Sequence, residues 1–221
     1  DVNLASCKVT ATGLKAVARS RTLRKLEMTY TLVGEGLGEL LSSWPLLEQL
    51  GLFGTQVNDE VLVRIPICPR LKVLTIGGSV PITDSGLKCI AERCTNLERL
   101  NCQGSSGLLG TTLVPFAPLR ELRHLSFIGE QVTEEGINVL KTLPFLESIV
   151  LGNPGANQSL ALLLRVENKF RSLSIGRYET TPQLTEADFR LIRQYRGLRE
   201  LEFHGALAVT DTAIRDLAQM E

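Results

Sequence analysis

Two histidines and five cysteines are the side chains of this sequence best suited to metal binding or nucleophilic catalysis (His124, His204, Cys7, Cys68, Cys89, Cys94 and Cys102). The histidines lie on predicted strands three positions apart in a sheet, a separation of about 14 Å at about 4.8 Å per strand. Cys89 and Cys94 stand five residues apart on a predicted helix, so their side chains diverge. We therefore expect no metal site, no cofactor and no catalytic centre.

The other patterns that could carry chemistry lead to the same expectation. Cys68 and Cys94 occupy a mostly apolar position of a repeat, which is typical of buried structural thiols. The run Gly104-Ser105-Ser106-Gly107 lacks the lysine and the strand-loop-helix continuation of a phosphate-binding loop. Because the cysteines are odd in number and are not clustered at the two ends, the sequence favours a reducing, intracellular compartment, cytoplasmic or nuclear.

Composition narrows the classes of partner. The chain has 221 residues, 43% of them hydrophobic, and has no apolar run near the roughly 18 residues that cross a bilayer. Lys plus Arg and Asp plus Glu both number 24, so the formal net charge is +0. A strong average field that would attract nucleic acid or anionic lipid is missing. We expect neither a nucleic-acid ligand nor a membrane span.

A sequence repeat predicts the strands and helices of this chain. The pattern L-x-x-L-x-L recurs at intervals of 24 to 28 residues, with anchors at Leu23, Leu47, Leu71, Leu97, Leu122, Leu146, Phe170 and Leu198. Alternation such as Leu74-Thr75-Ile76 predicts a short strand in each repeat. A helix start such as Thr83-Asp84 follows, in which the threonine can cap the free amides and the aspartate complements the helix dipole. Equivalent starts follow Val9, Val57, Val132, Leu184 and Val209.

One strand and one helix per repeat predict an α/β horseshoe solenoid of about nine repeats, with a parallel sheet on the concave side and helices on the convex side. Residues 1–221 form one domain in this interpretation. Strand-like residues at Val2 and a helix running to Met220 lack polar caps, so we expect a segment of a longer protein. The sequence indicates no oligomeric state.

The stretch 82–100, I-T-D-S-G-L-K-C-I-A-E-R-C-T-N-L-E-R-L, resembles the cysteine-containing subclass of leucine-rich repeats. That subclass occurs in F-box substrate receptors of cullin-type ubiquitin ligases and in related adaptors. The resemblance is closest around Cys68 and Cys94. It implies a non-enzymatic protein–protein interaction module that recognises substrates for an F-box-type ligase. Two alternatives remain: an architectural scaffold of the cytoskeleton or cilium, and a Ran-type GTPase-activating protein.

Three segments depart from the repeat, and each follows a predicted strand: residues 103–118, 153–157 and 176–183. Pro115 and Pro118 predict a short or irregular outer segment in the first of them. Thr31 and Thr55 stand where the consensus repeat has asparagine, and their hydroxyls can make the same local hydrogen bonds.

Side chains that alternate with the strand leucines face the open side of such a sheet. Ser174 is one of the residues we expect to lie open there. Apolar residues beside an arginine and a histidine resemble the anchors and rim of a protein interface. We therefore predict that a protein partner binds the concave middle and its adjoining rim through Phe53, Arg99, Gln103, His124, Ile128 and Tyr178.

Overall fold

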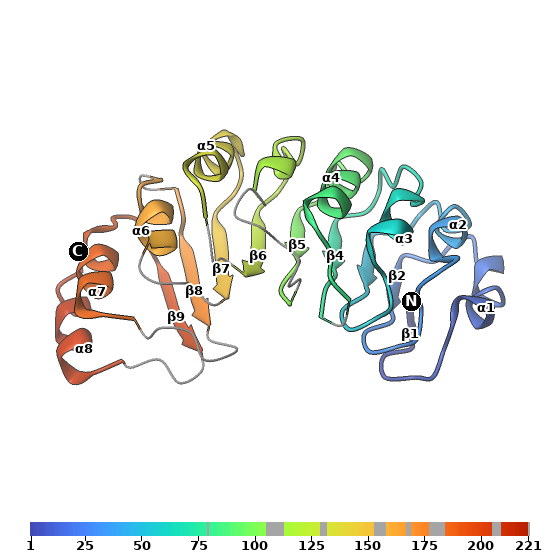
Figure 1. Ribbon diagram of the computed structural model, residues 1–221, viewed down its shortest axis with the longest axis horizontal. Coiled ribbons are helices and arrows are strands. Elements are labelled where there is room, and N and C mark those ends of the chain that lie inside the picture. The colour runs from blue at the N-terminus through green and yellow to red at the C-terminus, as the bar shows by residue number, and fades with distance from the viewer. Residues whose placement is uncertain are drawn as a thin grey trace.

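A computed structural model shows how the chain is arranged, and it describes residues 1–78, 80–104, 113–128, 132–152, 158–166, 169–176, 184–204 and 209–220. Within these residues, nine parallel strands form one sheet in chain order. Figure 1 shows an arch whose inner side is the sheet and whose outer side is covered by helices. The predicted horseshoe solenoid is confirmed.

The strands are short because each repeat contributes only a few residues before it turns. Their bounds are β1 (Val2–Asn3), β2 (Lys25–Glu27), β3 (Gln49–Gly51), β4 (Val73–Thr75), β5 (Arg99–Asn101), β6 (His124–Ile128), β7 (Ser148–Gly152), β8 (Ser172–Gly176) and β9 (Glu200–His204). Leu26 pairs with Leu50, and Leu50 pairs with Leu74. The same in-register column of apolar residues continues to Leu201. Strands β2 to β8 each bury one face, whereas the end strands β1 and β9 are only partly buried.

The outer layer is more varied than the sheet. Its α-helices are α1 (Ala11–Leu14), α2 (Leu37–Leu41), α3 (Asp59–Val63), α4 (Asp84–Arg93), α5 (Glu134–Thr142), α6 (Gln158–Leu164), α7 (Glu186–Gln194) and α8 (Asp211–Leu217), and the 3-10 helices are η1 (Val17–Arg19) and η2 (Val114–Phe116). Side-chain caps hold the expected starts of α3, α4, α5, α7 and α8. Thr10 makes no side-chain cap, and α1 has only 4 residues.

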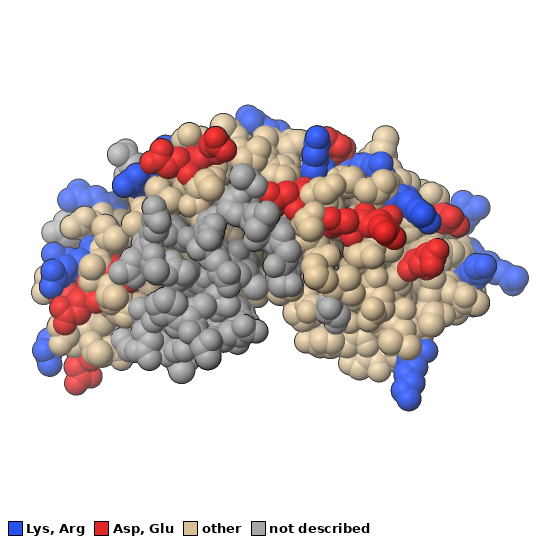
Figure 2. All heavy atoms as spheres, in the orientation of Figure 1, with Lys and Arg blue, Asp and Glu red and all other residues tan. Residues whose placement is uncertain are grey.

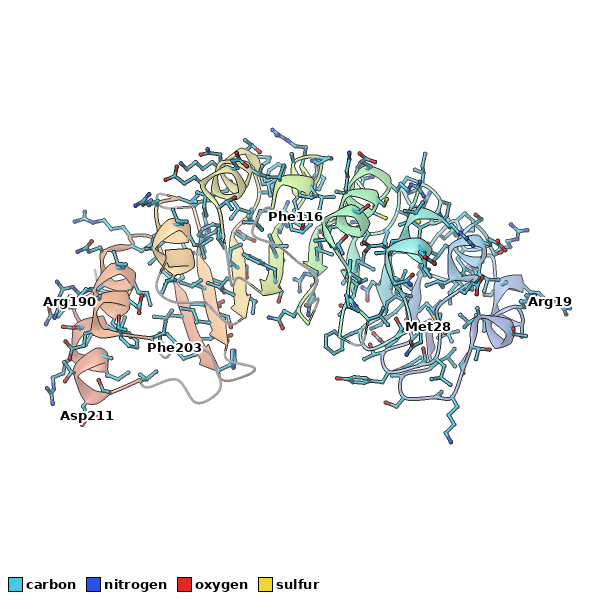
Figure 3. The ribbon with its side chains drawn as sticks, viewed as in Figure 1. Arg19, Met28, Phe116, Arg190, Phe203 and Asp211 are labelled. Carbon is cyan, nitrogen blue, oxygen red and sulfur yellow. The ribbon has the colours of Figure 1, made fainter. Side chains whose placement is uncertain are left out.

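The core lies between the sheet and the outer layer. Seven of the eight repeat anchors are buried, whereas Leu198, near the end of the stack, is only partly buried. Figure 3 shows Met28 and Phe116 inside this layer and Arg19 and Arg190 on the outer surface. A chain of adjacent repeats therefore shares one continuous core, in which each repeat depends on its neighbours.

Two local expectations are confirmed. The buried hydroxyls of Thr31 and Thr55 donate to the carbonyl oxygens of Met28 and Leu52, each over 2.7 Å. The described part of residues 103–118 has only the three-residue η2 as an outer helix. Each helix in the described part of the chain is too short or too polar to cross a bilayer.

Candidate partner-binding face

Arg99 and His124 are direct neighbours on the concave face. They begin β5 and β6, and their Cα atoms are register partners. Arg99 is exposed and His124 is half-buried. Val73, half-buried, lies on the other side of Arg99 in register. The middle of the sheet thus presents a guanidinium group between an imidazole and an apolar side chain.

Partial burial lowers the pKa of His124, and the positive charge of Arg99 lowers it further. Arg123 acts in the same direction, whereas Glu147 opposes it. A neutral imidazole can both donate and accept a hydrogen bond, while the arginine beside it only donates. This pair can therefore recognise a polar partner group without a second positive charge.

Phe53 is half-buried and follows β3, yet its ring extends across the exit of β4 to the exit of β5. A Cβ atom on Gly78 would lie 3.1 Å from ring atom Cε1, and one on Gly104 would lie 3.4 Å from Cε2. Because these two residues have no side chain, the ring can lie over their backbone. Gln103 precedes Gly104, and its backbone N–H donates to Asn101 Oδ1 over 3.0 Å. The structure thus brings Phe53 to the edge that holds Gln103.

Tyr30 is a surface residue that the sequence patterns did not single out. Its ring meets that of Phe53 edge-on, with centroids 5.7 Å apart and planes at 89°. It has a φ of 57°, which costs a non-glycine residue roughly 1–2 kcal/mol, and it is 61% exposed. The repeat could have indicated that Tyr30 is unusual, because Gly54, Gly78 and Gly104 occupy the same position in the next three repeats.

The other predicted site residues are only partly accounted for. Ile128 ends β6 opposite Gly152, but its side chain lies outside the described residues. Tyr178 and the segments 153–157 and 177–183 also lie outside them. Ser174 belongs to the concave ladder but is only 4% exposed, so the expectation that it lies open is wrong. Its Cα partners in the register are Val150 on β7 and Glu202 on β9.

Charge follows a pattern along one edge of the sheet. The position that precedes strands β2 to β5 alternates in sign, from Arg24 through Glu48 and Lys72 to Glu98. Arg24 pairs with Glu48, and Lys72 Nζ lies 2.8 Å from Glu98 Oε1. Figure 2 shows acidic side chains gathered over α3 and α4, whereas the lower part of the N-terminal limb is mostly uncharged. Although the formal net charge is +0, acidic side chains are thus concentrated on one part of the surface.

The five thiols differ in exposure, and the pKa is raised for the two buried ones. Cys94 and Cys102 are buried, Cys68 and Cys89 are partly buried, and Cys7 is exposed. A hydrogen bond between Cys68 and Cys94 raises the pKa of Cys94, as does its burial. Burial raises the pKa of Cys102 to about 12. Within the described ranges, no three His, Cys, Asp or Glu side chains converge as metal ligands would.

Comparison with known proteins finds F-box/LRR-repeat proteins and a mitotic exit network antagonist among the relatives of this chain. The chain is 30% identical to human F-box/LRR-repeat protein 12 over 112 residues, which are 50% of this chain and 34% of that protein. It is 28% identical to Antagonist of mitotic exit network protein 1 of Candida glabrata over 185 residues, 79% of this chain and 36% of that protein. The chain thus spans about a third of the length of these relatives. No protein-family model matches the chain.

Among solved structures, the chain is similar to TLR13 in its complex with ssRNA13, with a TM-score of 0.57 and 16% sequence identity. The similarity covers 99% of this chain and 38% of that one. At this identity the likeness concerns the fold alone. Together with the nine-stranded sheet of the described residues, it shows that the fold is a leucine-rich-repeat solenoid.

Proposed function

We propose that this chain is a non-enzymatic protein-interaction module that binds a partner protein on its concave face and adjoining rim. The observation that supports this best is the group on β4 to β6. Val73, Arg99 and His124 lie side by side there and alternate with the residues that build the core. Arg99 makes no ion pair with any described residue, so its guanidinium group is available to a partner.

We further propose that the module recognises substrates for an F-box-type ubiquitin ligase in the cytoplasm or nucleus. Two observations support this finer assignment. The repeat around Cys94 resembles the cysteine-containing subclass found in F-box receptors, and a relative that matches half of the chain is an F-box/LRR-repeat protein. The relatives are longer than the matched segment, so an F-box would be supplied by sequence outside these residues.

The test uses the whole protein that carries this chain, purified from cells with a cullin adaptor subunit co-expressed. We expect the adaptor to co-purify with the wild type and equally with an Arg99→Ala, His124→Ala double variant. The substrate partner should co-purify with the wild type and be lost from the double variant. Each substitution should weaken substrate binding by about 2 kcal/mol, because central interface residues dominate affinity.

The matched control is a Lys88→Ala, Glu92→Ala double variant on the outer face of α4. These two side chains are exposed and 3.9 Å apart. They should affect neither adaptor nor substrate. Failure of the adaptor to co-purify would contradict the ligase assignment and favour an architectural scaffold. Loss of the partner from the outer-face variant alone would place binding on the convex side.

A further inference from the structure

Tyr30 and Phe53 form an exposed aromatic corner at the N-terminal end of the concave rim. Tyr30 lies over Gly54, where an added Cβ atom would collide with its ring. Phe53 lies over Gly78 and Gly104 in the same way. Leu32, two residues after Tyr30 in the sequence, is 55% exposed. The two rings thus pack over glycine backbone, and their planes are nearly perpendicular to each other.

The backbone under this corner is already hydrogen-bonded. The N–H of Tyr30 donates to Phe53 O over 2.8 Å, and that of Gly54 donates to Gly77 O over 2.7 Å. The N–H of Gly78 donates to Gly104 O over 3.2 Å. A partner strand therefore finds no free donors here among these residues. The Tyr30 side chain, in contrast, is 61% exposed and open to a partner.

A carboxylate lies next to the corner. Glu27 ends β2 and extends over Gly51, whose added Cβ atom would meet the carboxylate oxygens. Its Oε1 accepts a hydrogen bond from the backbone N–H of Thr29 over 3.0 Å. This bond holds the carboxylate against the residue that precedes Tyr30 in the sequence. Gly51, which lies under the Glu27 carboxylate, and Gly54, which lies under the Tyr30 ring, are three residues apart in the sequence. The carboxylate and the Tyr30 ring therefore lie over the same short segment of chain.

No cation of the described residues neutralises Glu27. The nearest basic residue in sequence, Lys25, is exposed on the same strand and forms no ion pair with it. A partly buried carboxylate without a counter-ion attracts a positive charge more strongly than a fully solvated one. Aromatic faces attract cations as well, and tyrosine is among the best of them.

We propose that this aromatic corner and Glu27 bind a lysine or arginine side chain of the partner protein. The aliphatic stem of that side chain packs on the Tyr30 and Phe53 rings, and its charged end reaches the Glu27 carboxylate. Tyr30 adopts a left-handed backbone at a position where the next three repeats have glycine. This conformation costs free energy in a residue that carries a side chain. This inference rests on the proposed function, because it names the partner chemistry at one end of the concave face.

The test selects a random-peptide library displayed on phage against the chain of residues 1–221, with counter-selection on a Tyr30→Gly variant. We expect the enriched peptides to share a lysine or arginine beside an apolar residue. Titration calorimetry with a synthetic enriched peptide should show about tenfold or greater weakening for Tyr30→Gly, Phe53→Ala and Glu27→Gln. Replacing the basic residue of the peptide by norleucine should weaken binding to the wild type and have little effect on Glu27→Gln.

Ser6→Gly is the matched control, since Ser6 has a φ of 60° at the same repeat position one repeat earlier. Both glycine variants should raise the melting temperature by about 2–4 °C, because both relieve left-handed strain. Only Tyr30→Gly should lose the peptide. A melting temperature that falls for Tyr30→Gly, with lost binding, would mean that the ring serves the fold and would overturn the inference.

Peptides without basic residues, or peptides that bind Glu27→Gln as well as the wild type, would also overturn it. So would a selection in which no sequence prefers the wild type over Tyr30→Gly. If a parallel selection without counter-selection yields only peptides that depend on Arg99 and not on Tyr30, this inference alone is overturned and the proposed function stays in place. Binding that survives both Arg99→Ala and Tyr30→Gly would contradict the proposed function.

Discussion

The Asp59 carboxylate accepts a hydrogen bond from the backbone N–H of Thr83 over 3.0 Å, and it also accepts one from the Thr83 hydroxyl. The two residues belong to successive repeats. Thr83 in turn accepts from the N–H of Ser85 over 3.2 Å and so caps α4. The first residue of one outer helix thus fixes the start of the next, which links neighbouring repeats by polar contacts in addition to the shared core.

Asp59→Ala should destabilise the chain by about 1–3 kcal/mol. The substitution leaves the partly buried N–H of Thr83 without an acceptor and removes the negative charge at the start of α3. Asp211→Ala is the control, because Asp211 also begins a helix but is exposed, and no hydrogen bond or ion pair joins it to another repeat within the described residues. It should cost about 0.5 kcal/mol or less. Urea unfolding followed by circular dichroism measures both, and equal losses would show that the link between repeats contributes nothing.

Leu74→Ala should cost about 2–5 kcal/mol, because Leu74 is only 3% exposed in the middle of the sheet column. Gln49→Ala, on the exposed side of the neighbouring strand, should change stability by about 0.5 kcal/mol or less. The comparison of their unfolding midpoints tests which side of the sheet faces the core. Similar midpoints would reverse that assignment.

Tyr195→Phe should destabilise the chain by about 1–3 kcal/mol. The Tyr195 hydroxyl accepts from the backbone N–H groups of Lys169 and Phe170 over 2.9 and 2.8 Å and donates to Val166 O over 2.8 Å. Phenylalanine keeps the ring, which stacks on that of Phe170, but leaves these groups unsatisfied. Thermal unfolding measures the loss. Amide hydrogen exchange at Phe170 should also become faster in the variant, and unchanged exchange there would contradict the role of the hydroxyl.

The repeat made most of the fold predictable. Anchors such as Leu47 and Leu71 recur at the interval of one strand and one outer segment, so the parallel sheet follows from spacing alone. The short α2 was not predicted, because Gly36 caps it in a left-handed conformation without a polar side chain. Hydrogen bonds between repeats, such as that from Thr83 to Asp59, were also missed. These hydrogen bonds form only when two side chains point toward each other, and the spacing of residues in the sequence does not show where a side chain points.

The candidate site was less predictable than the fold. Alternation along β5 and β6 predicted that Arg99 and His124 face the open side, and the register confirms that they are neighbours. The contact between Phe53 and Tyr30 depends on a left-handed backbone and on glycines in two later repeats. The backbone conformation and the glycines determine where each ring can pack. Their combined effect can be seen only in the structure, where residues of successive repeats lie side by side.

His124 should titrate below its ordinary pKa of 6.5, and removing Arg99 should raise that pKa. Burial disfavours the charged imidazolium, and the guanidinium of Arg99 repels it. Proton NMR of the imidazole Cε1–H against pH measures this, with a His204→Gln background to assign the signal. Arg99→Ala should move the midpoint upward, whereas Glu147→Gln should move it further down, because Glu147 attracts the imidazolium.

The same shift sets the sign of a stability change. Since the pKa of His124 is lower in the folded chain, the unfolded chain binds the proton more readily at any pH between the two pKa values. The folded state therefore loses stability as the pH falls from about 6.5 through the folded pKa, and the loss is complete below it. Arg99→Ala should reduce this dependence, which urea unfolding at a series of pH values would show. A His124 midpoint that does not move in Arg99→Ala would contradict the electrostatic coupling between Arg99 and His124.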